Sequence, residues 1–181
     1  MNIVKQQWNG DRLNVSSAWR GLEFYMNPII EQFKITPKIA LEFGVDLGYS
    51  SHIFSQIFDK VIGIDKFDGD EHIHHVQDEN FYQSVISRFK NTNVDIIKSD
   101  FRDFILYNEN KYDLIHIDIV HLYNETYECA EWAIAHSDVV LLHDTCSFSC
   151  INDVCMDISK KFGVGYYNIP EYYGLGILYK I

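Results

Sequence analysis

The sequence predicts an α/β fold in which a mostly parallel sheet is covered by helices on both faces. Apolar segments of strand length alternate five times with segments of helical spacing, and two further strand-like segments end the chain. Such alternation is typical of parallel strands joined by crossover helices. The 181 residues suit a single domain with a full hydrophobic core.

Apolar periodicity and turn residues place the elements along the chain. We expect a helix from Ser16 or Ser17 to about Lys34, with a kink or a break into two short helices at Pro28. The predicted strands are Lys38–Phe43, Val61–Ile64, Val94–Ile97, Tyr112–Asp118, Val139–Leu142, Val164–Ile169 and Leu175–Lys180. The predicted helices among them are Tyr49–Phe58, Phe81–Phe89, Phe101–Tyr107, Tyr123–Ala135 and Cys150–Phe162.

The domain organisation is simple, because no repeat, low-complexity tract or linker divides the chain. We expect residues 37–181 to form the ligand-binding domain. Residues 1–36 are then an N-terminal helical segment that packs on the site or covers it. Trp8 and Trp19 in this segment suit either a cover over the site or a homo-oligomer contact, and the sequence does not decide between them.

Charge and composition exclude several classes of partner. The formal net charge is −11, whereas a nucleic-acid binder needs a basic face to neutralise phosphates. No apolar stretch approaches the length that spans a bilayer, and the N-terminus has no secretory apolar region, so we expect a cytoplasmic protein without a membrane partner. The four cysteines form no C-x-x-C pair, which favours free thiols over a zinc site.

Two glycines flank the turn after the first predicted strand, in the run Glu42-Phe43-Gly44-Val45-Asp46-Leu47-Gly48. Glycine permits unusual backbone angles and a close approach of a ligand. The dinucleotide fingerprint G-x-G-x-x-G is absent, since Asp46 stands where it needs glycine. A carboxylate there disfavours a pyrophosphate and suits a cationic ligand without phosphate, such as S-adenosylmethionine (SAM). The alternative is a tight turn that binds no ligand.

Acidic residues also follow the second and third predicted strands. Asp65 lies 21 residues after Gly44 (65 − 44), a spacing at which a carboxylate can accept both hydroxyls of a ribose. Asp100 can hold an adenine edge while Phe101 packs on its face, or Asp100 can simply cap the next helix. An adenosine-containing ligand explains both positions, although a solvated loop acid explains either one alone.

Two carboxylates and two imidazoles follow the fourth and fifth predicted strands: Asp118, His121, His143 and Asp144. If these strands are neighbours, the four side chains converge above the glycine turn. Such a cluster can hold Mg²⁺ through Asp118 and Asp144, or a histidine can remove a proton from an acceptor hydroxyl. The alternative is helix capping by Asp144.

Two further groups of histidines are less informative. His116 lies inside the fourth predicted strand, where a hydrogen-bonded core histidine is the expected role. The run that contains His72, His74 and His75 lies in a predicted loop, where a solvated or substrate-facing segment is favoured over a metal site.

With these motifs in place, the chain resembles the class I SAM-dependent methyltransferases. The run ALEFGVDLGYSS is similar to their first motif, E-x-G-x-x-x-G-x-S/T, and VIGID and SDF are similar to their second and third. The stretches DKFDGDEH, HIDIVHLY and LHDT bring the resemblance closer to the methyltransferase-24 type. This type usually has glycine after the strand-four aspartate, where this chain has Ile119, a difference that bears on the acceptor pocket.

The resemblance implies a single Rossmann-like domain with a seven-stranded sheet whose last strand is antiparallel. It also implies a set of cofactor contacts, which are Glu42, Gly44, Gly48, Ser50, Asp65, Lys66, Asp100, Phe101 and Asp118.

We therefore expect a methyltransferase that acts on a hydroxyl of a small molecule or sugar. His121 is our first candidate for the general base and His143 the second, with Asp118 and Asp144 orienting the base or holding Mg²⁺. Two alternatives stay open from the sequence. One is a SAM-fold binding module without catalytic activity, and the other is a nucleotide-dependent oxidoreductase.

Overall fold

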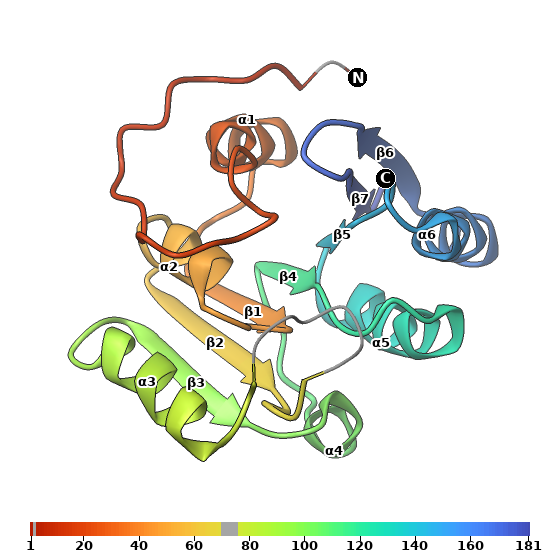
Figure 1. Cartoon of the computed structure of the whole chain (residues 1–181). Coiled ribbons are helices and arrows are strands. Elements are labelled where there is room, and N and C mark those ends of the chain that lie inside the picture. Colours follow the sequence, from red (N-terminus) through yellow and green to blue (C-terminus); the bar gives the residue numbers. More distant parts are fainter. Residues whose placement is uncertain (2, 70–75) are drawn as a thin grey trace.

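Seven strands form one sheet in the computed structural model, which describes residue 1, residues 3–69 and residues 76–181. The strands are β1 (Ile39–Phe43), β2 (Lys60–Asp65), β3 (Val94–Lys98), β4 (Leu114–Ile117), β5 (Val139–His143), β6 (Gly165–Ile169) and β7 (Leu175–Tyr179). Their order across the sheet is β3-β2-β1-β4-β5-β7-β6 (Figure 1). The first five strands are parallel, and β7 is antiparallel to both β5 and β6, as predicted.

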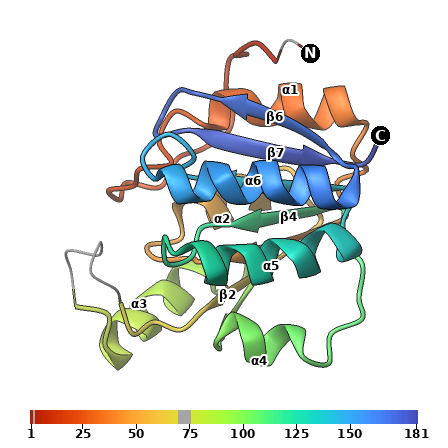
Figure 2. The ribbon, with the colours of Figure 1, turned by 90° about the vertical axis from the view of Figure 1, so that its right-hand side faces the viewer.

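Helices cover both faces of the sheet, which confirms the predicted layers (Figures 1 and 2). The helices are α1 (Glu23–Phe33), α2 (Tyr49–Ser55), α3 (Glu79–Phe89), α4 (Phe101–Ile105), α5 (Tyr123–His136) and α6 (Ser149–Phe162). The first three share one hydrophobic cluster with residues of the sheet, and the last three share another on the opposite face. No helix in the described part of the chain is long and apolar enough to cross a membrane.

The first helix differs from its prediction. It begins at Glu23 rather than near Ser17, because residues 18–22 form turns and Ser17 Oγ accepts the backbone N–H of Trp19. Pro28 lies inside one helix and does not divide it. A proline leaves the carbonyl four residues earlier without its helical donor. That carbonyl belongs to Phe24, and it accepts a hydrogen bond of 2.9 Å from the backbone N–H of Gln6. The extended N-terminal segment thus compensates for the proline.

The other elements begin and end close to their predicted limits. The clearest differences are α2, which ends three residues earlier than predicted, and β4, which is three residues shorter. Beyond Ser55 the chain continues in turns in which Gln56 N–H bonds to Ile53 O and Ile57 N–H to Phe54 O. These tighter turns end the regular helix while the apolar side chains still reach the core.

The order of the strands reverses between β1 and β4, and there the two strands approach each other closely. Gly44, directly after β1, has a φ of +88°. A Cβ at this position would lie 1.8 Å from the carbonyl oxygen of Asp118, directly after β4. Glycine is therefore required both by the backbone angle and by the space. The reversal of strand order is also where parallel α/β sheets bind their ligands.

We expect Gly44→Ala to lower the free energy of unfolding by about 3 kcal/mol, since a left-handed residue costs about 1–2 kcal/mol and overpacking costs a similar amount. Gly163→Ala is the matched control. Gly163 also has a positive φ, of +68°, but a Cβ there meets nothing within 4 Å. It should cost only about 1 kcal/mol in urea unfolding. Equal losses in the two variants would contradict the role of the β1–β4 contact.

Candidate functional site

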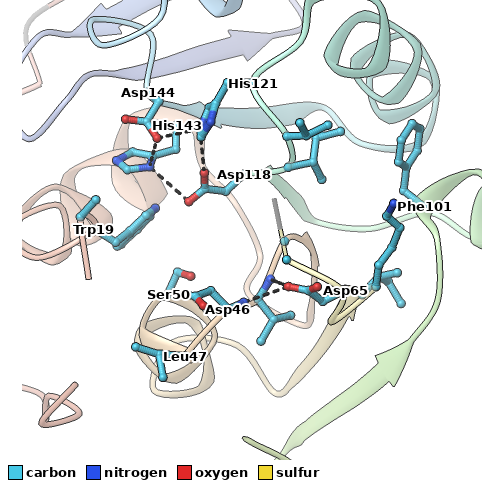
Figure 3. A pocket seen from close by; sticks show the side chains of 18 of the residues that line it. Trp19, Asp46, Leu47, Ser50, Asp65, Phe101, Asp118, His121, His143 and Asp144 are labelled. Carbon is cyan, nitrogen blue, oxygen red and sulfur yellow. Dashed lines mark hydrogen bonds and ion pairs between the residues drawn. The ribbon is translucent and has the colours of Figure 1, made fainter. Parts of the chain in front are cut away.

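A cavity of about 790 Å³ lies beyond the carboxyl ends of β1 to β5. The turns after these strands form most of its wall, and residues 17–19 of the N-terminal segment close one side (Figure 3). Small-molecule sites commonly measure roughly 300–1,000 Å³, so the cavity has room for a ligand of substantial size. Most of the predicted cofactor contacts line it, namely Gly44, Ser50, Asp65, Lys66, Asp100, Phe101 and Asp118.

The carboxylate of Asp65 holds the glycine turn in place. Its Oδ2 accepts the backbone N–H groups of Val45 at 2.7 Å and Asp46 at 2.9 Å, and its Oδ1 accepts that of Phe67 at 2.7 Å. Burial raises the pKa of Asp65, and the hydrogen bonds from Asp46, Phe67 and Val45 oppose that rise. We predicted that this carboxylate meets a ribose. Each oxygen already accepts from the backbone and Asp65 also lines the cavity, so Asp65 shapes the turn, while its contact with a ribose stays a prediction.

Glu42 was predicted to contact a cofactor, but it lies outside the cavity. Its side chain is fully buried and accepts hydrogen bonds from Ser51 Oγ and from His116 Nδ1, the latter at 2.9 Å. Trp19 Nε1 donates to His116 Nε2 at 3.1 Å, which fixes the imidazole tautomer. His116 is thus the hydrogen-bonded core histidine that was expected. Alternation along β1 could have revealed the position of Glu42, because it shares a sheet face with Ala40.

Gly48 also lies outside the cavity, and its requirement for glycine is structural. It precedes α2 with a φ of +79°, and a Cβ there would meet the ring of Phe89 at 2.6 Å. The two glycines of the first motif are therefore needed for different reasons. Gly44 lets two strands approach, whereas Gly48 lets α3 pack against the start of α2.

Asp100 caps a helix and also lines the cavity, so its position is compatible with both roles that the sequence left open. It caps α4 by accepting the backbone N–H of Arg102 at 2.8 Å, and it also lines the cavity. Lys66 Nζ lies 3.8 Å from its carboxylate and 3.2 Å from that of Asp68. Phe101 is buried at 7% exposure and forms part of the same wall. Helix capping and ligand contact are therefore compatible at this position.

Four polar side chains converge at the ends of β4 and β5, as predicted, and we call them the strand-end cluster: Asp118, His121, His143 and Asp144 (Figure 3). His121 Nε2 lies 3.0 Å from Asp144 Oδ2 and 3.9 Å from Asp118 Oδ1. His143 Nδ1 lies 3.2 Å from Asp118 Oδ2 and 3.3 Å from Asp144 Oδ2. Each carboxylate thus contacts both imidazoles.

His143 is held as a cation. Its Nδ1 faces two carboxylates, and its Nε2 donates to the carbonyl oxygen of Tyr172 at 3.2 Å, so both nitrogens have acceptors. Burial alone would lower its pKa, but Asp118 and Asp144 outweigh burial and raise it to about 10. A doubly protonated imidazole has no lone pair with which to remove a proton. The geometry therefore argues against His143 as the general base.

His121 is placed differently from His143. Its ring stacks on Phe148 at a centroid distance of 4.1 Å and an interplanar angle of 6°, and it lines the cavity. Although burial favours a neutral Asp144, hydrogen bonds from His121 and His143 hold the pKa of this carboxyl well below its usual value. Asp144 has a φ of +63°, and this turn aims its carboxylate at both imidazoles. Asp144 therefore orients His121 at the cavity wall.

The cluster fits Mg²⁺ poorly as it stands. Asp118, His143 and Asp144 each offer a ligand atom, and these atoms lie within 4.8 Å of one another. Mg²⁺ prefers a shell of oxygen atoms. Here both carboxylates already face the imidazolium of His143, which occupies the position between them that a cation would need. We therefore derive no step through a metal.

Several wall residues were not singled out from the sequence. Ser147, Phe148 and Tyr173 all line the cavity. Phe148 could have been suspected, because it follows the fifth strand by only a few residues. Tyr173 comes from the β6–β7 turn, and no local pattern connects that turn with the cavity. The His72, His74 and His75 run lies outside the described residues.

Comparison with known proteins agrees with this geometry. A family model for a methyltransferase domain, of the methyltransferase-24 type, matches residues 41–145. The search of curated protein sequences gives no match.

Among solved structures, a Staphylococcus aureus protein provisionally described as a caffeoyl-CoA O-methyltransferase is 20% identical, with a TM-score of 0.67 over 94% of this chain and 86% of that one. The methyltransferase PaMTH1 of Podospora anserina, solved with S-adenosylhomocysteine (SAH), is 13% identical, with a TM-score of 0.67 over 92% and 80% of the two chains. An rRNA methylase from Streptococcus thermophilus is 12% identical, with a TM-score of 0.57 over 87% and 95%. The TM-scores show a shared fold, and identities this low show no more than that.

The raised pKa of His143 predicts how stability depends on pH. Asp118 and Asp144 raise the pKa of the folded-state imidazole to about 10, whereas an unfolded histidine has a pKa of about 6.5. Its stabilising contribution is therefore complete below about pH 6.5 and is lost as the pH rises through about 10.

We expect the free energy of unfolding to fall across this pH window in the wild type more than in His143→Gln. The difference between the two falls should be at least about 1.4 kcal/mol, which corresponds to a shift of one pKa unit. Urea unfolding of both proteins in EDTA between pH 6 and 10 measures the difference, because the groups that they share cancel. Parallel pH profiles would show that His143 is not held as a cation.

Proposed function

The chain belongs to the methyltransferase-24 family of SAM-dependent methyltransferases, and we propose that it transfers the methyl group to a hydroxyl oxygen of a small molecule. The observation that carries the proposal is His121, which lines the cavity, is oriented by Asp144 and stacks on Phe148. The S. aureus protein with the same fold is also described as an O-methyltransferase.

The cavity wall suits SAM, which is cationic at sulfur and carries no phosphate. Among the described residues, the wall contains two Lys or Arg side chains and seven carboxylates, which are Asp46, Asp65, Asp68, Asp100, Asp118, Glu125 and Asp144. When bound, SAM supplies an electrophilic methyl group on a sulfonium centre. We assign the cofactor contacts to Gly44, Ser50, Asp65, Lys66, Asp100, Phe101 and Asp118.

The chain's own residues would then do three things. The glycine turn, fixed by Asp65, supports the cofactor. The N-terminal segment excludes water from one side through residues 17–19. His121 Nε2 donates to Asp144, which keeps the ring in place, so the proton of the acceptor hydroxyl would pass to Nδ1 of His121, while the Asp118–His143 pair holds Asp144. Alignment of acceptor and methyl group supplies much of the acceleration in such reactions.

We expect Asp65→Ala to weaken SAH binding at least tenfold, because the backbone N–H groups of the glycine turn lose their acceptor. Isothermal titration calorimetry with SAH measures this. Asp68→Ala is the matched control, since Asp68 also lines the cavity but contacts Lys66 instead of the turn. It should bind within about twofold of the wild type, a change worth about 0.4 kcal/mol. A wild-type protein that binds no SAH would overturn the cofactor assignment.

For the base, we expect His121→Gln to reduce kcat about 100-fold or more while SAH binding is retained, as for other general bases. SAH release in the presence of an accepted hydroxyl compound measures turnover, both in EDTA and with Mg²⁺. His136→Gln is the control, because His136 stacks on Trp132 away from the cavity. Full turnover by His121→Gln would remove His121 from the mechanism.

A further inference from the structure

The cavity has two chemically different ends. The cofactor end is built from the glycine turn and the ends of β2 and β3. We use the name acceptor end for the part formed by Trp19, Asp118, His121, His143, Asp144, Ser147, Phe148 and Tyr173. Figure 3 shows Trp19 on the same side as the strand-end cluster, across the cavity from Phe101.

Basic side chains in the wall are confined to the cofactor end. Among the described residues, Lys66 and Arg102 are the Lys and Arg side chains that line the cavity. Each is already paired with carboxylates. Lys66 lies 3.2 Å from Asp68, and Arg102 Nε lies 2.7 Å from Glu128.

Among the described residues, the acceptor end has no Lys or Arg side chain that could bind a phosphate or carboxylate. Asp118 and Asp144 carry two negative charges, and the imidazolium of His143 balances one of them. An anion placed here would meet like charge in a partly desolvated site, which is costly.

Apart from Ser147, aromatic rings supply the rest of the acceptor end. Trp19 is buried, with its indole fixed by the hydrogen bond to His116, so it forms a rigid wall. Phe148 presents the ring on which His121 stacks, and Tyr173 is 58% exposed at the rim. Aromatic walls favour flat apolar groups, and π faces near carboxylates also favour cations.

We infer that the acceptor is a small aromatic hydroxyl compound that is uncharged or cationic and carries no phosphate. This rests on the proposed function and narrows it, since it excludes acceptors linked to coenzyme A or to a nucleotide. It separates this chain from the S. aureus protein of the same fold, whose described acceptor is a coenzyme A thioester.

The test uses ligands that share one ring and differ in charge: dopamine, 4-methylcatechol and 3,4-dihydroxybenzoate, with caffeoyl-CoA as the phosphorylated probe. Binding to the SAH-loaded wild type is measured by calorimetry at pH 7.5 in EDTA. We expect dopamine and 4-methylcatechol to bind at least tenfold more tightly than the benzoate, and caffeoyl-CoA not to bind. Tighter binding of the benzoate or caffeoyl-CoA, or binding of none of the phenols, overturns the inference. SAH release with SAM tests methyl transfer separately, so the two proposals can fail independently.

A charge placed at the rim sharpens the test. Ser147 is exposed and lines the acceptor end, whereas Ser149 is exposed two residues later and lies outside the cavity. Ser147→Lys should reduce the preference for dopamine over the benzoate about tenfold, and Ser149→Lys should leave it unchanged. If Ser147→Lys leaves the preference unchanged, charge does not select the acceptor and the inference fails.

Discussion

The carboxylate of Asp65 ties the end of β2 to the turn after β1, and the shape of the cavity depends on this contact. Three backbone N–H groups converge on its two oxygens, two of them from Val45 and Asp46. Without Asp65 these donors would lack this acceptor, which is costly in a partly buried site. The same turn also requires Gly44, because β1 and β4 approach too closely there for a side chain. One buried carboxylate and one glycine thus position the cofactor end.

At the other end of the cavity, charge balance rather than packing organises the site. Two aspartates lie close together, and the imidazolium of His143 lies between them. This leaves Asp144 free to orient His121 as well, so that the two histidines have different roles although they share their acidic partners. The difference follows from their surroundings. His143 is buried against the carbonyl of Tyr172, whereas His121 stacks at the cavity wall.

The N-terminal segment is part of the fold as well as of the site. The backbone N–H of Gln6 replaces the helical donor that Pro28 lacks in α1. Trp19 is connected to the core by its hydrogen bond to His116, which in turn donates to Glu42. The same Trp19 forms a wall of the acceptor end. A cover that is hydrogen-bonded to the core in this way is rigid at its inner edge. This supports the proposed role of residues 1–36 as a segment that packs on the site rather than as a separate unit.

The sequence by itself determined the order and type of nearly every strand and helix, because alternating apolar segments can be buried in few ways. It also predicted where the cavity and the strand-end cluster lie, since the carboxyl ends of parallel strands meet at one edge and Asp118, His121, His143 and Asp144 follow two such strands. Only the tertiary structure decided which atoms pair. Contacts between distant segments paired Glu42 with His116, paired Asp65 with the turn after β1 and brought Gln6 to Phe24. Hydrogen bonds of that kind depend on distances across the fold, and no local periodicity encodes them.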